Sequence, residues 1–213
     1  MPNEFLHEEL SRNITKILDS HIVIFGCGAI GANLAISLAR RGFNSFSLID
    51  RDRIVSHNIS TQPWTAFDEK RQKVDVLAQQ LLSINKNIKF AILNFTNIAS
   101  PEYLYKLVCN DTKLLVDSTD NKEARKIAQN IVSNSKYVLH VGLSAEGTGE
   151  VTWGKNYTIP EEVTLHDPCA YPMSRTLIEL TIIAAAEAII EFLLNNKQNN
   201  YLIQSKNLKI QLV

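Results

Sequence analysis

Apolar residues along the chain follow two alternating patterns, which predict the secondary structure. Short continuous apolar runs are typical of buried strands, and apolar residues that recur every three or four positions are typical of helices. From His21 to Asp50 these patterns predict a strand, a tight turn, a helix and a second strand. Further strands are expected at 88–95, 113–121, 137–143, 149–153 and 208–213. Further helices are expected at 3–18, 68–84, 101–110, 121–134 and 173–195.

The turn after the first strand carries Gly26, Gly28 and Gly31 in the spacing G-x-G-x-x-G. Glycines let the chain turn sharply and let phosphate oxygens approach the backbone, and the helix that follows offers free N–H groups to an anion. Asp50 ends the second strand about 20 residues later, where a carboxylate can accept hydrogen bonds from ribose hydroxyls. The pattern predicts a nucleotide site. The alternative is a tight packing turn without a ligand, and Cys27 within it is interpreted as a small packing residue.

Strands that alternate with helices of about 10–15 residues predict an α/β fold. We expect a Rossmann-like, mostly parallel sheet with helices on both faces and some antiparallel strands toward the C-terminus. A chain of 213 residues can bury a sizeable core, so 1–213 are expected to form a single domain. Within it, 1–19 are expected to be an N-terminal helical segment, and 155–172 a loop before the long helix 173–195.

Composition excludes several classes of partner and site. The 22 basic and 22 acidic residues cancel, so no net charge draws the chain to nucleic acid or to an anionic membrane. Three cysteines without a C-x-x-C motif make neither a disulfide framework nor a structural zinc site. The apolar run at 177–194 contains Glu179, Glu187 and Glu191, which indicates a buried helix rather than a membrane span. With no signal-peptide pattern at the N-terminus, we expect a cytoplasmic protein.

Polar residues that follow the predicted strands suggest the chemistry. The run from Asp117 to Asn121 brings Asp120 to the phosphate side of the sheet, where one carboxylate plus substrate phosphates can hold Mg²⁺. A nicotinamide hydride transfer needs no such metal. Asn58 and Gln62 are candidates for ribose or phosphate contacts, and Lys73 for a point charge on a polyphosphate. Their alternatives are hydrogen bonding within the loop for Asn58 and Gln62, and a solvated helix position for Lys73.

Taken in order, these residues resemble the ThiF/MoeB/HesA superfamily, whose relatives include the activating enzymes of ubiquitin-like proteins. In that family the glycine turn is followed by D-x-D, N-x-x-R-Q, a lysine and D-x-T-D-N-x-x-x-R. The resemblance covers roughly residues 20–195 and is most specific in the D-S-T-D-N run. The matching positions are Gly26, Gly28, Gly31, Asp50, Asp52, Asn58, Gln62, Lys73, Asp117, Thr119, Asp120, Asn121 and Arg125.

The resemblance implies an ATP- and Mg²⁺-dependent adenylyltransferase. A substrate carboxylate would attack the α-phosphate to give an acyl adenylate and pyrophosphate, the carboxylate being that of the C-terminal glycine of a ubiquitin-like or sulfur-carrier protein. Asp50 would hold the ribose, Asp120 the magnesium and Lys73 the phosphates. Asp120, Lys73 and Cys169 are the catalytic candidates, with Asp120 also the metal ligand. The nucleotide-binding candidates are Gly26, Gly28, Ala29, Ile30, Gly31, Asp50, Asp52, Asn58, Gln62, Lys73, Asp120 and Asn121.

The chain departs from the family pattern at several positions. Thr61 replaces the arginine of N-x-x-R-Q, so a planar cation is missing, and Arg51, Arg53 or Arg12 are candidates to replace it. The family's zinc-binding cysteine pairs are also missing, so no zinc is expected. Cys169 lies near the position of a nucleophilic cysteine in some relatives, with His166 nearby, and its alternative is an ordinary loop residue.

Other functions remain open on the sequence. The carboxylate could instead belong to a small molecule or to a tRNA, as in the dehydratase branch of the family. Thr61 leaves room for a non-catalytic nucleotide-binding homodimer. An NAD-dependent oxidoreductase is disfavoured by the D-S-T-D-N run. A homodimer is expected because the helix 173–195 is apolar over much of its circumference, while His140 is interpreted as a satisfied core histidine.

Overall fold

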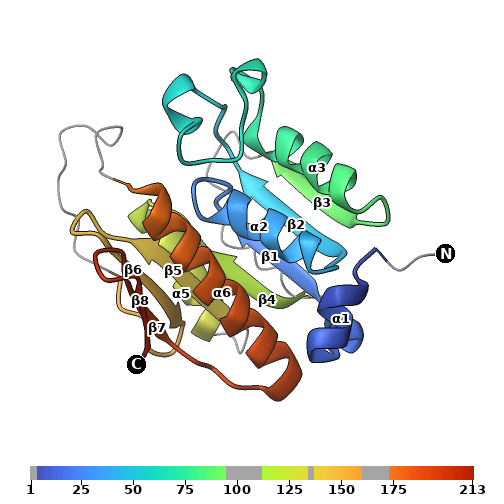
Figure 1. The fold of residues 1–213 in the computed structure, drawn as a ribbon. Coiled ribbons are helices and arrows are strands. Elements are labelled where there is room, and N and C mark those ends of the chain that lie inside the picture. Colours follow the sequence, from blue (N-terminus) through green and yellow to red (C-terminus); the bar gives the residue numbers. More distant parts are fainter. Residues whose placement is uncertain (1–3, 95–111, 134–136, 160–172) are drawn as a thin grey trace.

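Eight strands form one mixed sheet in the computed structural model, which describes residues 4–94, 112–133, 137–159 and 173–213 (Figure 1). The order across the sheet is β3-β2-β1-β4-β5-β6-β7-β8. The strands are β1 (His21–Phe25), β2 (Ser45–Asp50), β3 (Lys89–Asn94), β4 (Thr112–Asp117), β5 (Val138–Leu143), β6 (Thr148–Trp153), β7 (Tyr201–Gln204) and β8 (Lys209–Leu212). Pairing is parallel from β3 to β5 and antiparallel from β5 to β8. The predicted fold class is confirmed.

Helices cover both faces of this sheet, as expected for an α/β fold (Figure 1). On one face lie α2 (Gly31–Arg40), α3 (Lys73–Ile84) and α6 (Arg175–Asn195). On the other face lies α5 (Lys122–Ser133), which contacts β4 and β5. Side chains of successive strand residues point to opposite faces, so β1 contributes Ile22 and Ile24 to one hydrophobic cluster and Val23 to the other. The run IVIF of β1 is therefore continuously apolar, because both faces of the strand are buried.

The register of the parallel strands brings their carboxyl ends level with one another. Phe25, the last residue of β1, pairs with Ile49 on β2 and with Asp117 on β4. Asp117 in turn pairs with His140 on β5. The segments that follow β1, β2 and β4 therefore emerge side by side at one edge of the sheet, where ligands of such folds bind.

The N-terminal segment departs from the single helix expected at 3–18. Helix α1 (Leu6–Arg12) ends at Asn13, whose φ of 52° is left-handed, and a separate 3₁₀ turn covers Ile14–Ile17. Ile14 and Ile17 are buried in the core, but α1 has no buried residue. The prediction of one continuous helix was wrong because an asparagine tolerates the left-handed conformation that ends a helix.

The structure differs from the sequence prediction at further places, and the strand expected at 113–121 already ends at Asp117. The helix expected at 68–84 begins only at Lys73, since 3₁₀ turn Ala66–Asp68 and Lys70, with a φ of 68°, precede it. Strand β7 was not predicted, because it is only four residues long and follows an asparagine-rich turn. The helix expected at 101–110 lies outside the described residues.

Helix α6 buries its apolar circumference within the chain itself. Ser174 caps it by accepting a hydrogen bond from the amide of Leu177 at 3.1 Å, and the helix contacts α2, β5, β6, β7 and the first 3₁₀ turn. Of its large apolar residues, only Ile183 is substantially exposed. The apolar character of α6 therefore does not by itself require a partner chain. Within the described ranges, no helix is long and apolar enough to cross a membrane.

The glycine turn is held against the end of β4 by close backbone packing. The hydroxyl of Ser118 donates to the carbonyl oxygen of Gly26 at 2.7 Å, and the amide of Ser118 donates to that of Phe25 at 2.9 Å. Gly31, the first residue of α2, lies so close to Gly26 that an added Cβ would overlap its carbonyl oxygen. Gly28 differs, since a Cβ there would meet nothing within 4 Å.

This difference predicts that an alanine substitution lowers the stability of the protein at Gly31 but not at Gly28. We expect Gly31→Ala to lower the free energy of unfolding by about 1–3 kcal/mol, because the new methyl group must displace backbone. We expect Gly28→Ala to leave stability nearly unchanged, and it is the matched control. Urea denaturation of both variants measures this, and equal stabilities would contradict the packing described for Gly31.

Candidate functional site

The backbone amides of the glycine turn are available to an anion. Gly26 has a φ of 92°, which reverses the chain directly after β1. Within the described part of the chain, the amides of Gly28, Ala29 and Ile30 donate no backbone hydrogen bond. Gly28 faces open space, and these amides lie at the start of α2, where the helix dipole is positive. Such a turn can bind the phosphate of a nucleotide.

Asp50 is fixed beside this turn by two backbone hydrogen bonds. Its Oδ2 accepts from the amide of Cys27 at 2.6 Å, and its Oδ1 accepts from the amide of Asp52 at 2.8 Å. Burial raises the pKa of the Asp50 carboxyl, and the nearby Lys73 opposes that rise. The two oxygens retain lone pairs, so this carboxylate can also accept hydrogen bonds from a hydroxyl group.

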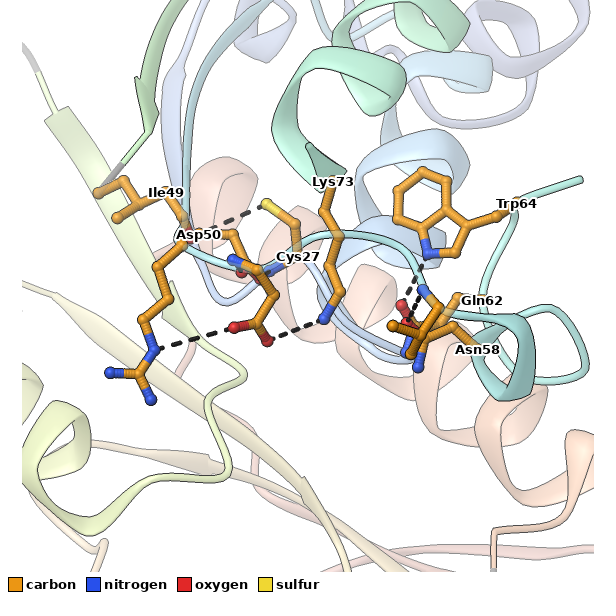
Figure 2. A network of polar contacts seen from close by, with 10 residues as sticks. Cys27, Ile49, Asp50, Asn58, Gln62, Trp64 and Lys73 are labelled. Atoms are coloured by element: carbon orange, nitrogen blue, oxygen red, sulfur yellow. Dashed lines mark hydrogen bonds and ion pairs between the residues drawn. The ribbon is translucent and has the colours of Figure 1, made fainter. Parts of the chain in front are cut away.

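Cys27 has the packing role that its place in the turn suggested. The side chain is fully buried, and its Sγ lies 3.9 Å from the carbonyl oxygen of Ile49 (Figure 2). Burial raises the pKa of the Cys27 thiol well above its ordinary value, with the charge of Asp50 as the second cause. A thiol in this state is a poor nucleophile, which confirms the interpretation of Cys27 as a packing residue.

Lys73 forms an ion pair with Asp52. Its Nζ lies 3.0 Å from Asp52 Oδ2, and its amide donates to the Asp52 carbonyl oxygen at 3.1 Å. The Lys73 side chain is only 9% exposed, against 55% for Asp52, so the alternative of a solvated helix residue was wrong. Arg51 Nε is 3.8 Å from the other oxygen of Asp52. The side chains of Lys73 and Arg51 thus both approach the half-exposed carboxylate of Asp52, close to the glycine turn.

Asn58 and Gln62 stabilise the loop between β2 and α3 from its buried side. Asn58 Oδ1 accepts from the amide of Val55 at 3.2 Å, and Gln62 Oε1 accepts from the indole N–H of Trp64 at 2.7 Å (Figure 2). Both side chains are largely buried. The loop is joined to α2 because Asn33 Nδ2 donates to the Thr61 carbonyl oxygen at 3.0 Å. The interpretation of these two polar residues as hydrogen-bonding partners within the loop therefore has direct geometric support.

Among the polar residues from Asp117 to Asn121, some hold the local structure by hydrogen bonds, whereas Asp120 is available to a ligand. Asp117 is buried, and its Oδ1 accepts from both the amide and the hydroxyl of Thr119. Asn121 precedes α5, and its Oδ1 accepts from the amides of Glu123 and Ala124 at 2.8 and 3.2 Å, as a helix cap does. Asp120 is exposed, and its carboxylate has no hydrogen-bond or ion-pair partner among the described residues.

This arrangement fits magnesium bound together with a phosphate ligand. No three His, Cys, Asp or Glu side chains of the described residues gather closely enough to enclose a metal. Mg²⁺ characteristically keeps several waters and takes one or two carboxylates plus substrate phosphates, so the single available carboxylate of Asp120 matches its needs.

Of the remaining candidate residues, Arg12 and Arg53 have partners elsewhere. Arg12 pairs with Glu187 on α6 of the same chain, and Arg53 donates to the carbonyl oxygen of Lys70. Cys169 and His166 lie outside the described residues. The structure also shows residues that the sequence did not single out, Ser118 and Asn33, which hold the turn and the loop in place. Ser118 lies within a polar run and Asn33 is a polar residue between Ala32 and Leu34, and neither position gave a periodic signal of its role.

Comparisons with known proteins show what the chain is similar to. A model described as the ThiF family matches residues 5–209. The sulfur carrier protein ThiS adenylyltransferase of Bacillus subtilis is 30% identical over 115 residues, which cover 53% of this chain and 33% of that protein. The tRNA threonylcarbamoyladenosine dehydratase of Haemophilus influenzae is 25% identical over 114 residues, covering 53% of this chain and 43% of that protein.

A crystal structure of MccB from E. coli with MccA-N7isoASN shares the fold. Its TM-score is 0.75 at 19% identity, and the match covers 93% of this chain and 65% of that one. At this identity the likeness shows the fold alone. The matches cover only 33% and 43% of the length of the two curated relatives described.

The loop geometry predicts a structural effect of one substitution. In Gln62→Ala the buried indole N–H of Trp64 loses its acceptor, so the free energy of unfolding should fall by about 1–3 kcal/mol. Gln79→Ala is the matched control, because exposed Gln79 only accepts from Arg71 at the surface, and its effect should stay within about 0.5 kcal/mol. Thermal denaturation of both variants checks this. A fully stable Gln62→Ala protein with weakened ligand binding would instead favour a contact between Gln62 and the ligand.

Proposed function

The chain belongs to the ThiF family, and on this premise we propose that it is an ATP- and Mg²⁺-dependent adenylyltransferase that activates a carboxylate. The observation that carries the proposal is the row of free amides at Gly28, Ala29 and Ile30 beside the fixed carboxylate of Asp50. One oxygen of the substrate carboxylate attacks the α-phosphorus of ATP, and the bond to the leaving pyrophosphate breaks. The products are an acyl adenylate and pyrophosphate.

The residues divide the work of binding and orientation between them. The amides of the glycine turn bind phosphate oxygens, and Asp50 accepts hydrogen bonds from ribose hydroxyls. Asp120 would hold magnesium together with the phosphates, and the bound metal would supply positive charge next to the leaving pyrophosphate. Lys73 supplies a fixed positive charge, oriented by Asp52. Alignment of the carboxylate with the α-phosphorus requires no covalent residue.

Arg51 is the best placed of the three candidates to replace the family arginine that is Thr61 here. Arg12 and Arg53 have partners away from the glycine turn, at Glu187 and Lys70. The Arg51 side chain is 53% exposed and approaches Asp52, the partner of Lys73. A guanidinium at this place can contact phosphate oxygens in a bidentate manner, as the missing arginine would.

The substrate carboxylate belongs, in this proposal, to the C-terminal glycine of a small ubiquitin-like or sulfur-carrier protein in the cytoplasm. The name of the Bacillus relative, a ThiS adenylyltransferase, supports this class. A second candidate is a carboxylate borne by a tRNA or a small molecule, which the name of the Haemophilus relative favours. The zero formal net charge favours the protein substrate, because tRNA binding rests on a basic surface. Exchange assays with each substrate class distinguish the two.

Pyrophosphate exchange into ATP tests the proposed reaction, and Asp120 provides the sharpest variant. We expect carboxylate-dependent exchange in the wild type, and a fall of about 10²–10³-fold in Asp120→Asn, because one stabiliser of the leaving group is lost. Glu123→Gln is the matched control, since Glu123 is an exposed carboxylate three residues later. Calorimetry should show that magnesium no longer strengthens ATP binding to Asp120→Asn.

Two results would overturn the proposed adenylyltransferase function. Magnesium-independent binding of NAD with no binding of ATP would favour the oxidoreductase alternative. ATP binding without exchange for any carrier protein or small carboxylate would favour the non-catalytic alternative that Thr61 left open.

A homodimer belongs to the same proposal. Support comes from α1, where Leu6 and Leu10 are 45% and 75% exposed, rather than from α6, which the chain itself covers. Light scattering at micromolar concentration should give twice the mass of one chain for the wild type, and one chain's mass for Leu10→Glu. Leu208→Glu, at a leucine of the β7–β8 turn that is 67% exposed, should remain dimeric. A wild-type monomer would contradict the proposal.

A further inference from the structure

A small cavity lies one strand away from the glycine turn, at the carboxyl ends of β4 and β5. Its volume is about 50 Å³, and its lining includes Asp117, Thr119, Arg125, His140, Glu150 and Tyr157. A single water needs about 10–15 Å³ by the same kind of measure, so the cavity accepts a group of a few heavy atoms. None of these lining side chains has a task in the adenylation step described above.

Only one of the two ring nitrogens of His140 has a hydrogen-bond partner among the described residues. The interpretation of His140 as a satisfied core histidine was therefore wrong. The side chain is almost completely buried, and Nδ1 lies 2.8 Å from Oδ2 of Asp117. The other ring nitrogen, Nε2, is buried and has no hydrogen-bond partner in the described part of the chain. An unpaired buried polar atom is uncommon in a native protein and calls for a ligand or a function.

The hydrogen bond to Asp117 determines what Nε2 can do. A carboxylate accepts hydrogen bonds, so the proton of the neutral imidazole resides on Nδ1 and Nε2 presents a lone pair. The ring is held in this orientation by Tyr157, which stacks on it with ring centroids 3.6 Å apart. With the ring neutral, a group that occupies the cavity would donate a hydrogen bond to Nε2 of His140.

The charged side chains around the cavity indicate which kind of hydrogen-bond donor would bind to His140. Asp117 and Glu150 contribute two carboxylates, and Arg125 contributes one guanidinium, which is already bonded to the Thr119 carbonyl oxygen at 3.0 Å. Glu150 pairs with Gly142 across β5 and β6, and the absence of a side chain on Gly142 leaves room for the Glu150 carboxylate beside it. An excess of acceptors and of negative charge favours a cationic donor such as an ammonium group.

We propose that this cavity is a subsite for ammonia or a primary amine, with His140 and Glu150 as its acceptors and Asp117 as a positioning residue. The role of the amine rests on the proposed function, since its partner is the acyl adenylate. His140 Nε2 takes one proton from the ammonium group, which frees the nitrogen lone pair. The nitrogen then attacks the acyl carbon, the bond from that carbon to the phosphate oxygen breaks, and AMP leaves with the electron pair. The second proton goes to water, and the product is an amide.

Binding is tested without activity, on the unliganded protein, by ¹⁵N NMR of the histidine rings with methylammonium chloride as the probe. We expect the Nε2 signal of His140 to move saturably with methylammonium, and not with tetramethylammonium, which has the same charge but no N–H. His21 is an internal control, because its two ring nitrogens already lie 2.8 and 2.9 Å from the hydroxyls of Ser45 and Ser47. Glu150→Gln should weaken methylammonium binding about tenfold, equivalent to about 1.4 kcal/mol.

Activity is tested by the release of AMP from the adenylate as methylamine is added, with pyrophosphate exchange measured in parallel. The ratio of amine-dependent AMP release to exchange should fall at least tenfold in His140→Gln, and Glu150→Gln should raise the KM for methylamine more than it lowers kcat. An unmoved His140 signal would overturn the subsite. Exchange with AMP release that ignores methylamine would overturn the role of the amine. A moved signal without any exchange would support the subsite and overturn the adenylation reading instead.

Discussion

The close approach of Gly31 to Gly26 is the contact on which the site depends. It brings the first turn of α2 against the end of β1, and Ser118 at the end of β4 holds the same carbonyl oxygen. Any side chain at Gly31 would push the helix away from the strand. The helix start, with its free amides, is therefore kept at the carboxyl edge of the sheet by this packing and by the Ser118 hydrogen bond, before any ligand binds.

The surrounding elements extend this arrangement along one edge of the sheet. Asp50 joins β2 to the turn through the amide of Cys27, and the Lys73–Asp52 pair joins α3 to the loop that follows β2. On the other side, the last residue of β4 and the run that follows it provide two carboxylates with different surroundings. Asp117 is buried and bonded to His140, whereas Asp120 is exposed and available to a cation. Adenylation and the proposed attack by an amine would thus use neighbouring segments of one edge.

Much of the fold was predictable because it depends on two local sequence signals, the apolar runs of the buried strands and the glycines of the turn. Buried parallel strands are continuous apolar runs, and the turn needs glycine at fixed positions, so each can be recognised within a few residues. The break at Asn13 was not predictable, since an asparagine within a periodic pattern signals neither helix nor left-handed backbone by itself. Strand β7 exists because β6 and β8 flank it, which is a tertiary cause that the YLIQ run alone does not reveal.

The candidate site was predicted as a set of residues rather than as a set of contacts. Sequence order indicated that Asp52, Asn58, Gln62 and Lys73 belong near the nucleotide, but not that Gln62 accepts from Trp64 or that Lys73 pairs with Asp52. Such partners are chosen by the folded loop. The cavity at His140 was missed for the same reason, because Tyr157, Arg125 and Glu150 come from three separate segments.

The central claim, that free amides of the glycine turn bind the phosphates, is tested most directly by amide NMR with a nonhydrolysable ATP analogue and Mg²⁺. The account predicts that the largest shifts occur at the amides of Gly28, Ala29 and Ile30, and that the amides of Lys206 and Leu208 in the β7–β8 turn do not move. Unmoved amides at Gly28, Ala29 and Ile30 under saturating analogue would contradict it.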